Sequence, residues 1–315
     1  MLEVLGITGP IYLVIAIGYA AVRWGLLQSA DMRVLGRFVT AVAVPALLFR
    51  AVARLHIGEV LHLDYLAVYA AGSIATLIVG TVVAMKLRGR GLTHAAFLGL
   101  GGSSSNSAYV GYPLAAQVLG PVAAVGLALC MLVENLLVIP LAMAMAEAGG
   151  RDAHPWRLLR QTFTGLAKNP MIQGLVAGTV ASLAGWLPPA PIFKGISLLA
   201  DAAAPVALFV IGGSLVGLKL AGLRGDIAQV VVFKLLVHPL AIVGLLLVWP
   251  LAAPGLNAAA LIFAAVPMMS IYPMLALRHG LEQMSAAALL AATVVSFITL
   301  NLLLVSLPAG WIPPH

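Results

Sequence analysis

The sequence predicts an all-helical integral membrane protein with ten transmembrane helices, arranged as two inverted repeats of five. Composition, hydropathy and an internal repeat each indicate this class. Of the 315 residues, 62% are hydrophobic and 9% are charged, and the mean hydropathy is +1.09. A soluble domain is about half apolar and about a quarter charged. The chain therefore has too little polar surface for a water-soluble globule.

Ten stretches are long and apolar enough to cross a membrane as helices, which takes about 20 residues each. They are residues 5–23, 34–54, 65–87, 95–120, 122–147, 170–187, 192–218, 228–250, 256–278 and 284–307. The polar stretch 149–169 divides them, so we expect a first repeat at 1–148, a cytoplasmic linker at 149–169 and a second repeat at 170–315. The single cysteine, Cys130, excludes an internal disulfide and a cysteine-based metal cluster.

The distribution of basic residues predicts the orientation, because Lys and Arg concentrate on the cytoplasmic side of membrane proteins. If the N-terminus lies outside, fourteen of the 17 Lys and Arg residues face the cytoplasm, and three, Arg50, Arg54 and Lys194, face outside. We therefore expect both termini outside the plasma (inner) membrane. The same distribution accounts for the net charge of +7 without a nucleic-acid partner.

Prolines and glycines recur along the chain at a constant displacement of 160 residues. The prolines are Pro10, Pro45 and Pro113, which recur at Pro170, Pro205 and Pro273. The glycines are Gly18, Gly25 and Gly120, which recur at Gly178, Gly185 and Gly280. Coincidences at one displacement indicate an internal repeat. Because each half has an odd number of spans, the halves must insert in opposite orientations, as they do in many secondary transporters.

The fourth and ninth predicted spans are interrupted near their middle. The fourth has glycines, a serine run, an asparagine and a proline between residues 101 and 113, and the ninth has Pro267 and Pro273. Proline breaks helical hydrogen bonding, and in hydrocarbon a broken helix is tolerated where it lines a binding site. Half-helix N-termini at such a break favour an anionic group. The alternative is a pair of packing kinks with small residues.

Pro45 and Pro205, in the second and seventh spans, have apolar neighbours. This setting favours a hinge over a substrate contact. Asp201 precedes Pro205 in the seventh span, where we expect it to serve as an N-terminal cap that faces water.

Ionisable residues inside predicted spans are functional candidates by default, because burying a charge in a membrane is costly. Glu134 is the one acid well inside a span and is followed by Asn135. Lys234 and His238 lie four residues apart on the eighth span, hence on one face. All three charged or titratable residues are candidates for coupling to protons. The alternatives are a structural Glu134, a Lys234 that reaches the interface and a packed core His238.

The chain resembles the auxin efflux carrier family over essentially its whole length. The features that carry the resemblance are Pro10, Gly18-Tyr19 and Gly25, the segment Val44-Pro45-Ala46-Leu47-Leu48-Phe49, the segment Asn106-Ser-Ala-Tyr-Val-Gly111-Tyr-Pro113, and Lys234 with His238-Pro239. The resemblance implies a ten-helix fold similar to sodium/bile acid symporters, in which each half has a scaffold part and a crossover part. It also implies that helices 4 and 9 cross at the substrate site, and that a homodimer forms.

Family members carry organic anions such as malate, malonate or auxin-like acids. By resemblance, the substrate-binding residues lie at the two breaks and beside them. They are Asn106, Ser107, Gly111, Tyr112, Pro113, Asn135, Pro267, Ser270, Tyr272 and Pro273. The ninth span departs from the family pattern, because Met268 and Met269 make it bulkier and less polar. This departure leaves room for a less polar carboxylate.

We therefore expect a secondary active transporter, working by elevator or rocking motion, for a small organic anion such as a mono- or dicarboxylate. Its partners are the bilayer, the anion and a coupling H⁺ or Na⁺, with no cofactor and no metal. A transporter-like membrane sensor is one alternative, which calls for a soluble output domain. A cation/proton antiporter is another, which calls for acids at the crossing, and neither break contains Asp or Glu. No nucleophile elbow, zinc motif or phosphate loop indicates an enzyme.

Overall fold

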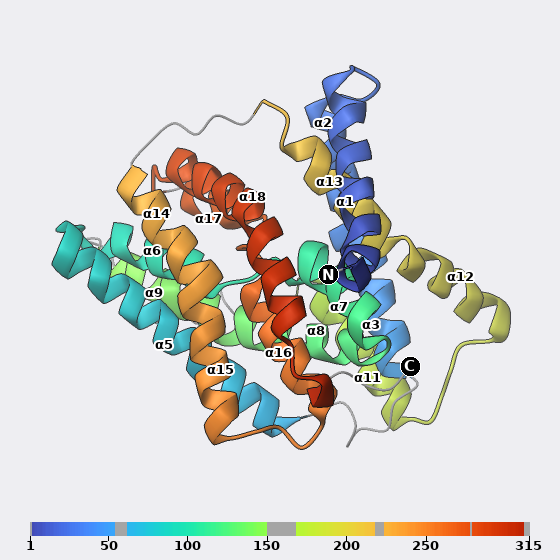
Figure 1. The fold of residues 1–315 in the computed structure, drawn as a ribbon. Helices are drawn as coiled ribbons and strands as arrows, with labels where there is room; N and C mark the ends of the chain where they lie inside the picture. The colour runs from blue at the N-terminus through green and yellow to red at the C-terminus, as the bar shows by residue number, and fades with distance from the viewer. Residues whose placement is uncertain (1, 54–61, 150–167, 218–223, 278, 312–315) are drawn as a thin grey trace. The chain divides into compact units, whose positions relative to one another are not determined.

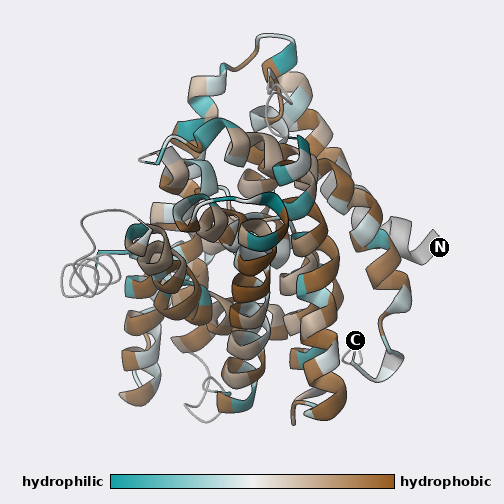
Figure 2. Ribbon diagram, turned by 90° about the vertical axis from the view of Figure 1, so that its left-hand side faces the viewer, coloured by the Kyte–Doolittle hydropathy of each residue, from teal (hydrophilic) through white to brown (hydrophobic). Residues whose placement is uncertain are grey.

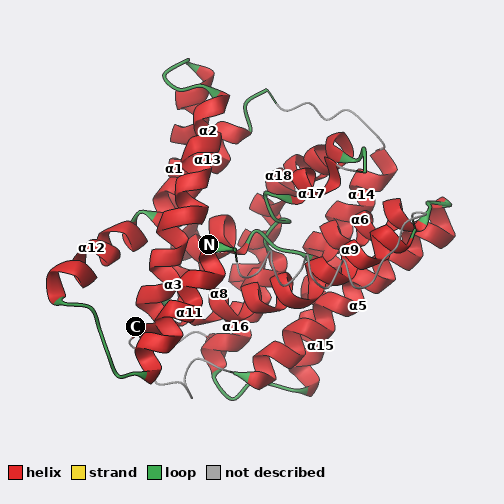
Figure 3. Ribbon diagram, turned by 180° about the vertical axis from the view of Figure 1, so that it is seen from behind, coloured by secondary structure: helices red, strands yellow, loops and turns green. Residues whose placement is uncertain are grey.

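The computed structural model describes residues 2–53, 62–149, 168–217, 224–277 and 279–311 (Figure 1). Apolar residues run along most of the helices, and hydrophilic residues gather mainly at helix ends and connections (Figure 2). Within the described ranges every regular element is a helix and none is a strand (Figure 3). The predicted all-helical class is confirmed. The linker expected at 149–169 lies almost wholly outside the described residues.

Six helices in the described part of the chain are long and apolar enough to cross a membrane. They are Ser29–Ala53, Leu63–Arg88, Val122–Ala148, Ala190–Ser214, Arg224–Val248 and Glu282–Ser306. Shorter apolar helices cover Leu13–Arg23, Pro170–Leu183 and Gly255–Ala265. These helices confirm an integral membrane protein, while the count of ten spans and their inverted arrangement stay predictions.

The chain forms two compact units, each assembled from separate stretches of sequence. Unit 1 comprises residues 1–63, 108–129 and 165–217, and unit 2 comprises 64–107, 130–164 and 218–315. Both units therefore take elements from both predicted repeats. The boundaries predicted at 148 and 170 divide the sequence into two repeats, whereas the two compact units divide the structure. The predicted repeat boundaries therefore stay a prediction.

Unit 1 contains the first, second, sixth and seventh predicted spans. Its elements are α1 (Leu2–Arg23), α2 (Ser29–Phe38), the π-turn η1 (Val39–Ala43), α3 (Val44–Ala53), α7 (Tyr112–Leu119), α11 (Pro170–Leu183), α12 (Ala190–Asp201) and α13 (Ala203–Ser214). Helix α1 packs along α13, and α3 packs along α11.

The α1–α13 pair and the α3–α11 pair of unit 1 contain the same contact between a glycine and a phenylalanine backbone, at positions displaced by 160 residues. A Cβ atom at Gly18 would overlap the backbone of Phe209, and one at Gly178 would overlap the backbone of Phe49. Gly178 lies 160 residues after Gly18, and Phe209 lies 160 residues after Phe49. The same glycine–backbone contact thus occurs twice with its partners exchanged, which is the relation that a two-fold axis produces.

The seventh span is interrupted at Ala202, between α12 and α13. Asp201 is the last residue of α12, so the expected N-terminal cap is wrong. Its carboxylate instead forms an ion pair with Arg50 of α3, with Oδ1 2.6 Å from Nη1, and Arg50 also donates to the carbonyl of Ser197. The pair joins α3 and α12 within unit 1, and the hinge at Pro45 and Pro205 stays a prediction.

Unit 2 contains the third, eighth, ninth and tenth spans, the first half of the fourth and the larger part of the fifth. Its elements are α5 (Leu63–Arg88), α6 (Leu92–Ser103), the π-turn η3 (Glu134–Val138), α9 (Ile139–Ala148), α14 (Arg224–Val232), the π-turn η4 (Phe233–Val237), α15 (His238–Val248), α16 (Pro254–Ala265), α17 (Tyr272–Leu277) and α18 (Glu282–Ser306). The π-turn η2 (Ser107–Gly111) and α8 (Val122–Val133) cross from one unit to the other. A 3₁₀ turn, η5 (Ala309–Trp311), follows α18.

Each of the four π-turns ends two residues before a proline: Pro45, Pro113, Pro140 or Pro239. A proline ring clashes with the carbonyl four residues earlier, and a turn widened by one residue relieves this clash. The widened bonds are seen where Ile139 N–H reaches the Glu134 carbonyl and where His238 N–H reaches that of Phe233. Two of these turns therefore begin at or beside the predicted coupling residues Glu134 and Lys234.

Candidate functional site

The two predicted interruptions meet inside unit 2. Helix α6 ends at Ser103 and the chain is extended at Ser104, while α16 ends at Ala265 and the chain is extended at Val266. The backbone N–H of Asn106 donates to the carbonyl of Pro267 (2.7 Å), and its side-chain amide donates to Ser270 Oγ (2.8 Å). Asn106 thus joins the two breaks through both its backbone and its side chain.

Glu134 binds the first break from η3. Its Oε1 accepts a hydrogen bond from the backbone N–H of Ser105 (2.7 Å), and its Oε2 accepts one from Ser107 Oγ (3.1 Å). The Glu134 side chain is buried. A helix break leaves backbone groups without helical partners, and this carboxylate satisfies one of them. Two donors on its two oxygens suit an ionised carboxylate, which only accepts.

Lys234 binds both breaks from η4. Its ammonium donates to Ser105 Oγ (2.6 Å), to the carbonyl of Ala264 (2.8 Å) and to His238 Nδ1 (2.9 Å). The side chain has no exposed surface, which excludes the alternative that it reaches the membrane interface. Three acceptors match the three donors of an ammonium group. Ala264 lies in the last turn of α16, where the helix dipole favours a cation.

The contacts of His238 define its tautomer. An ammonium on Lys234 can only donate, which assigns Nδ1 as the acceptor and the proton of a neutral ring to Nε2, 2.9 Å from Ser73 Oγ. Ser73 lies on α5, as does Tyr69, whose hydroxyl is 3.2 Å from Ser105 Oγ. The network therefore runs from α5 through the eighth span to the break in the fourth.

Ser105 lies between the two buried charges. Its N–H donates to Glu134 and its Oγ accepts from Lys234, so the carboxylate and the ammonium bind the backbone and the side chain of one residue. The two charged side chains are therefore linked through Ser105, and each makes one of its hydrogen bonds with this residue of the break.

Several residues predicted at the site lie apart from this network. The Asn135 amide donates to the carbonyl of Met131 on its own helix (2.8 Å). The Tyr272 hydroxyl donates to the carbonyl of Phe97 in α6 (2.8 Å), and Pro273 follows it in α17. Gly111, Tyr112 and Pro113 are assigned to unit 1, whereas Ser107 and the other residues of the network are assigned to unit 2.

Three residues of the network were not predicted: Ser105, Ser73 and Tyr69. A signal for two of them exists in the third span, where Tyr65, Tyr69 and Ser73 are spaced four residues apart and so share one face of the helix. All three side chains are fully buried. A polar stripe of this spacing in an apolar span indicates a face that packs against polar partners. Nothing in the sequence separates Ser105 from its neighbours Ser103 and Ser104.

Comparison with known proteins matches residues 7–305 to the family described as membrane transport protein. A Rhizobium meliloti protein named "Putative malonate transporter" is 29% identical over 315 residues, covering 99% of this chain and 98% of that protein. A Methanothermobacter thermautotrophicus protein named "Uncharacterized transporter" is 25% identical over 296 residues, covering 93% of this chain and 94% of that protein.

Proposed function

The chain belongs to the membrane transport protein family, as its resemblance to the auxin efflux carriers indicates, and we propose that it is a secondary active transporter that moves a small organic anion together with a proton. The observation that carries the proposal is the buried arrangement of Lys234, Ser105 and Glu134 at the broken helices. Buried charge at a discontinuous helix is expensive in a membrane protein and marks a transport or coupling site.

The two buried charges suggest how an anion and a proton are coupled. With Glu134 ionised, its negative charge balances the Lys234 ammonium. Protonation of Glu134 leaves Lys234 as an uncompensated cation beside the break, which favours binding of an anion. Ser107 can follow this change, because its Oγ lies within 3.1 Å of Glu134 Oε2 and 3.4 Å of the Ser105 carbonyl. It can accept from the protonated carboxyl and donate to that carbonyl instead.

A carboxylate is the anion that these groups suit best. Asn106 and Ser270 add an amide and a hydroxyl next to the buried cation, and both kinds of group hydrogen-bond carboxylate oxygens. Met268 and Met269 are buried beside them and add an apolar surface. The relative from Rhizobium meliloti is named for malonate, a small dicarboxylate. We therefore propose mono- and dicarboxylates of this size as the substrate class.

The inverted repeat supports an alternating-access mechanism of the elevator or rocking type. Leu63–Arg88 and Arg224–Val248 begin 161 residues apart, and Leu92–Ser103 and Pro254–Ala265 begin 162 residues apart. The exchanged contacts of Gly18 and Gly178 support the same relation. Two related halves have two nearly equivalent arrangements, one open to each side. We further propose a homodimer in the plasma membrane with both termini outside.

Flux measurements on the purified protein in proteoliposomes test the proposal. Labelled malonate, malate and an aromatic monocarboxylate are offered with an inward proton gradient, an inward sodium gradient or none. We expect uptake driven by the proton gradient, and loss of that uptake in Asn106→Ala. Asn135→Ala is the matched control, because this amide bonds only its own helix.

The other outcomes of the same measurement identify the alternatives. If the sodium gradient alone drives uptake, sodium is the coupling ion and the proton is not. Proton movement driven by a monovalent cation without any acid would indicate a cation/proton antiporter. Saturable binding of an acid without flux would indicate a sensor. No response to any acid under either gradient would refute the proposed function.

A further inference from the structure

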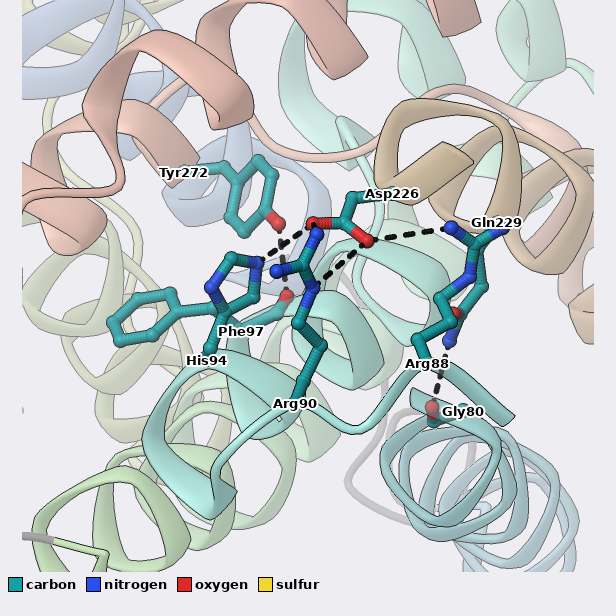
Figure 4. Close-up of polar contacts among 8 residues, drawn as sticks. All are labelled: Gly80, Arg88, Arg90, His94, Phe97, Asp226, Gln229 and Tyr272. Atoms are coloured by element: carbon teal, nitrogen blue, oxygen red, sulfur yellow. Dashed lines mark hydrogen bonds and ion pairs between the residues drawn. The ribbon is translucent and has the colours of Figure 1, made fainter. Parts of the chain in front are cut away.

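A second buried carboxylate lies in unit 2, away from the network described above. Asp226 is in the first turn of α14, and its side chain has no exposed surface. Arg90 reaches both of its oxygens, with Nη2 3.0 Å from Oδ2 and Nε 3.3 Å from Oδ1. His94 Nε2 lies 2.9 Å from Oδ2, and Arg88 Nη1 lies 3.4 Å from Oδ1. We call these four residues the Asp226 clasp (Figure 4).

The local sequence positions the basic side chains of the clasp. Helix α5 ends at Arg88, and Gly89 adopts a φ of 62°, which a residue with a side chain rarely does. The N–H of Arg90 then bonds back to the carbonyl of Ala84, a common way to end a helix. This tight connection places Arg88 and Arg90 on either side of one glycine, and α6 begins just beyond them with His94 in its first turn.

From the clasp, α6 and α14 run side by side in the same direction. A Cβ atom at Gly101 would lie 2.8 Å from Val230, and one at Gly102 would lie 2.7 Å from Phe233. The last contact along this interface is that of Ser105 with Lys234. The four contacts occur in the same order along α6 and its continuation to Ser105 and along α14 and η4, so the two segments are parallel neighbours with a buried charge near each end.

The spacing along the two helices links the ends of this interface. Eight residues lead from His94 to Gly102 and seven lead from Asp226 to Phe233, which packs against Gly102, so the two helices advance by about 12 and 10 Å between these contacts. Val230 and Phe233 pack so closely on Gly101 and Gly102 that a Cβ atom at either glycine would overlap them, so the helices interlock at this point. A fixed register at the clasp therefore determines where Ser105 lies relative to Lys234.

We propose that Asp226 is a positioning residue, which holds the register of α6 against α14 and thereby keeps Ser105 in contact with Lys234 and Glu134. Removal of its charge leaves Arg90 and Arg88 half-buried without a counter-charge, which drives the two helix ends apart. Its consequence for transport rests on the proposed function, whereas its consequence for the geometry of the break does not.

The single cysteine of the chain is a built-in reporter of that geometry. Cys130 is buried, and its Sγ lies 3.2 Å from Ser107 Oγ at the break. Modification of a buried thiol requires local opening of the structure around it. The rate at which N-ethylmaleimide labels Cys130 in the purified full-length protein therefore measures how firmly the break is held, whether or not any acid is transported.

The test compares this labelling rate among charge variants. We expect Asp226→Asn to raise it roughly ten-fold by favouring local opening, and Asp226→Glu, which keeps the charge, to restore most of the parental rate. Asp201→Asn removes a more exposed Asp–Arg ion pair from unit 1 and should leave the rate within about two-fold of the parent. His94→Gln leaves both arginines in place and should raise the labelling rate by a smaller factor than Asp226→Asn. This variant replaces Asp226→Asn in the test if Asp226→Asn does not fold.

The outcomes separate this proposal from the proposed function. A folded Asp226→Asn protein that labels at the parental rate overturns the positioning role, and so does an equal rise in Asp201→Asn. In the transport assay, Asp226→Asn should also shift the pH profile of uptake, because Lys234 and Glu134 lose their common partner. If no acid is transported by the parent but the labelling rates follow the expected order, the proposed function fails and the positioning of Ser105 stands.

Discussion

The ammonium of Lys234 lies 2.6 Å from the hydroxyl oxygen of Ser105, so a buried cation is bonded directly to the break in the fourth span. The same ammonium satisfies a carbonyl in the last turn of α16, at the break in the ninth span. One charged side chain thus holds both interrupted helices of unit 2. The consequences of this bond can be measured with single substitutions, each with a neighbouring residue as its control.

Lys234→Met should destabilise the protein strongly. The ammonium donates to three buried acceptors and is linked to the Glu134 carboxylate through Ser105. Its removal leaves those acceptors and a buried carboxylate uncompensated, which costs about 3–5 kcal/mol. The double variant Lys234→Met/Glu134→Gln removes both charges and should lose less stability than the sum of the two single variants. Unfolding midpoints in one detergent give the comparison. Additive losses would show that the two charges do not interact through Ser105.

Ser105→Ala should lower stability and substrate affinity, whereas Ser104→Ala should do neither. The Ser105 hydroxyl accepts from Lys234, and leaving a buried charged donor without that acceptor costs about 1–3 kcal/mol. The Ser104 hydroxyl donates to the carbonyl of Leu100 in its own helix, so removing this hydroxyl breaks no contact between helices. Thermal unfolding and the KM of uptake measure both effects. Equal effects of the two substitutions would show that the hydrogen bond between Ser105 and Lys234 contributes no more than that of Ser104.

The serine run shows how much of this site could be predicted from the sequence. The polar run and the glycines indicate a break, and the structure has one there. The separate roles of the serines depend on where the helix ends: Ser103 and Ser104 still bond carbonyls of their own helix, and Ser105, one residue further, bonds Lys234. A helix end is uncertain by one or two residues, and here that uncertainty decides which serine meets the charge.

Asp226 was missed for a similar reason. The eighth span is predicted to begin at residue 228, which leaves Asp226 in a solvated loop, whereas α14 begins at Arg224 and buries it. Its burial depends on Arg90 and His94, which lie 136 and 132 residues earlier in the chain. Hydropathy along one segment cannot identify a counter-charge that only the fold brings near. Glu134, deep inside an apolar span, needs no such partner to be recognised.

Glu134→Gln should abolish the pH dependence of uptake. In the parent protein, a lower pH protonates Glu134, frees the Lys234 charge and increases anion binding, so uptake should rise as pH falls, by up to about ten-fold per pH unit for one titrating group. Glutamine keeps an oxygen for the Ser105 N–H but cannot titrate. Initial rates between neutral and mildly acidic pH, without a gradient, provide the measurement. Asn135→Ala is the neighbouring control and should keep the parental profile.

A parental pH profile in Glu134→Gln would assign Glu134 a structural role and move proton coupling elsewhere. The result is interpretable only if the variant is folded, and the Cys130 labelling rate provides that check, because the thiol contacts Ser107 next to Glu134. A folded variant with a flat profile but normal affinity at acidic pH is the expected outcome. It would show that the carboxyl is needed to respond to protons and not to bind the anion.

Gly18→Ala and Gly178→Ala should both destabilise unit 1, Gly18→Ala more, because its Cβ would overlap a phenylalanine carbonyl more closely. Each glycine lies against the backbone of a phenylalanine, and a methyl group there forces the paired helices apart at a cost of about 1–3 kcal/mol. Gly195→Ala is the control, since a Cβ on this residue of α12 meets nothing within 4 Å and alanine favours the helix by up to about 1 kcal/mol. Unfolding midpoints compare the three. Because the two contacts are equivalent under the 160-residue displacement, a large loss in one variant with none in the other would contradict the two-fold relation itself.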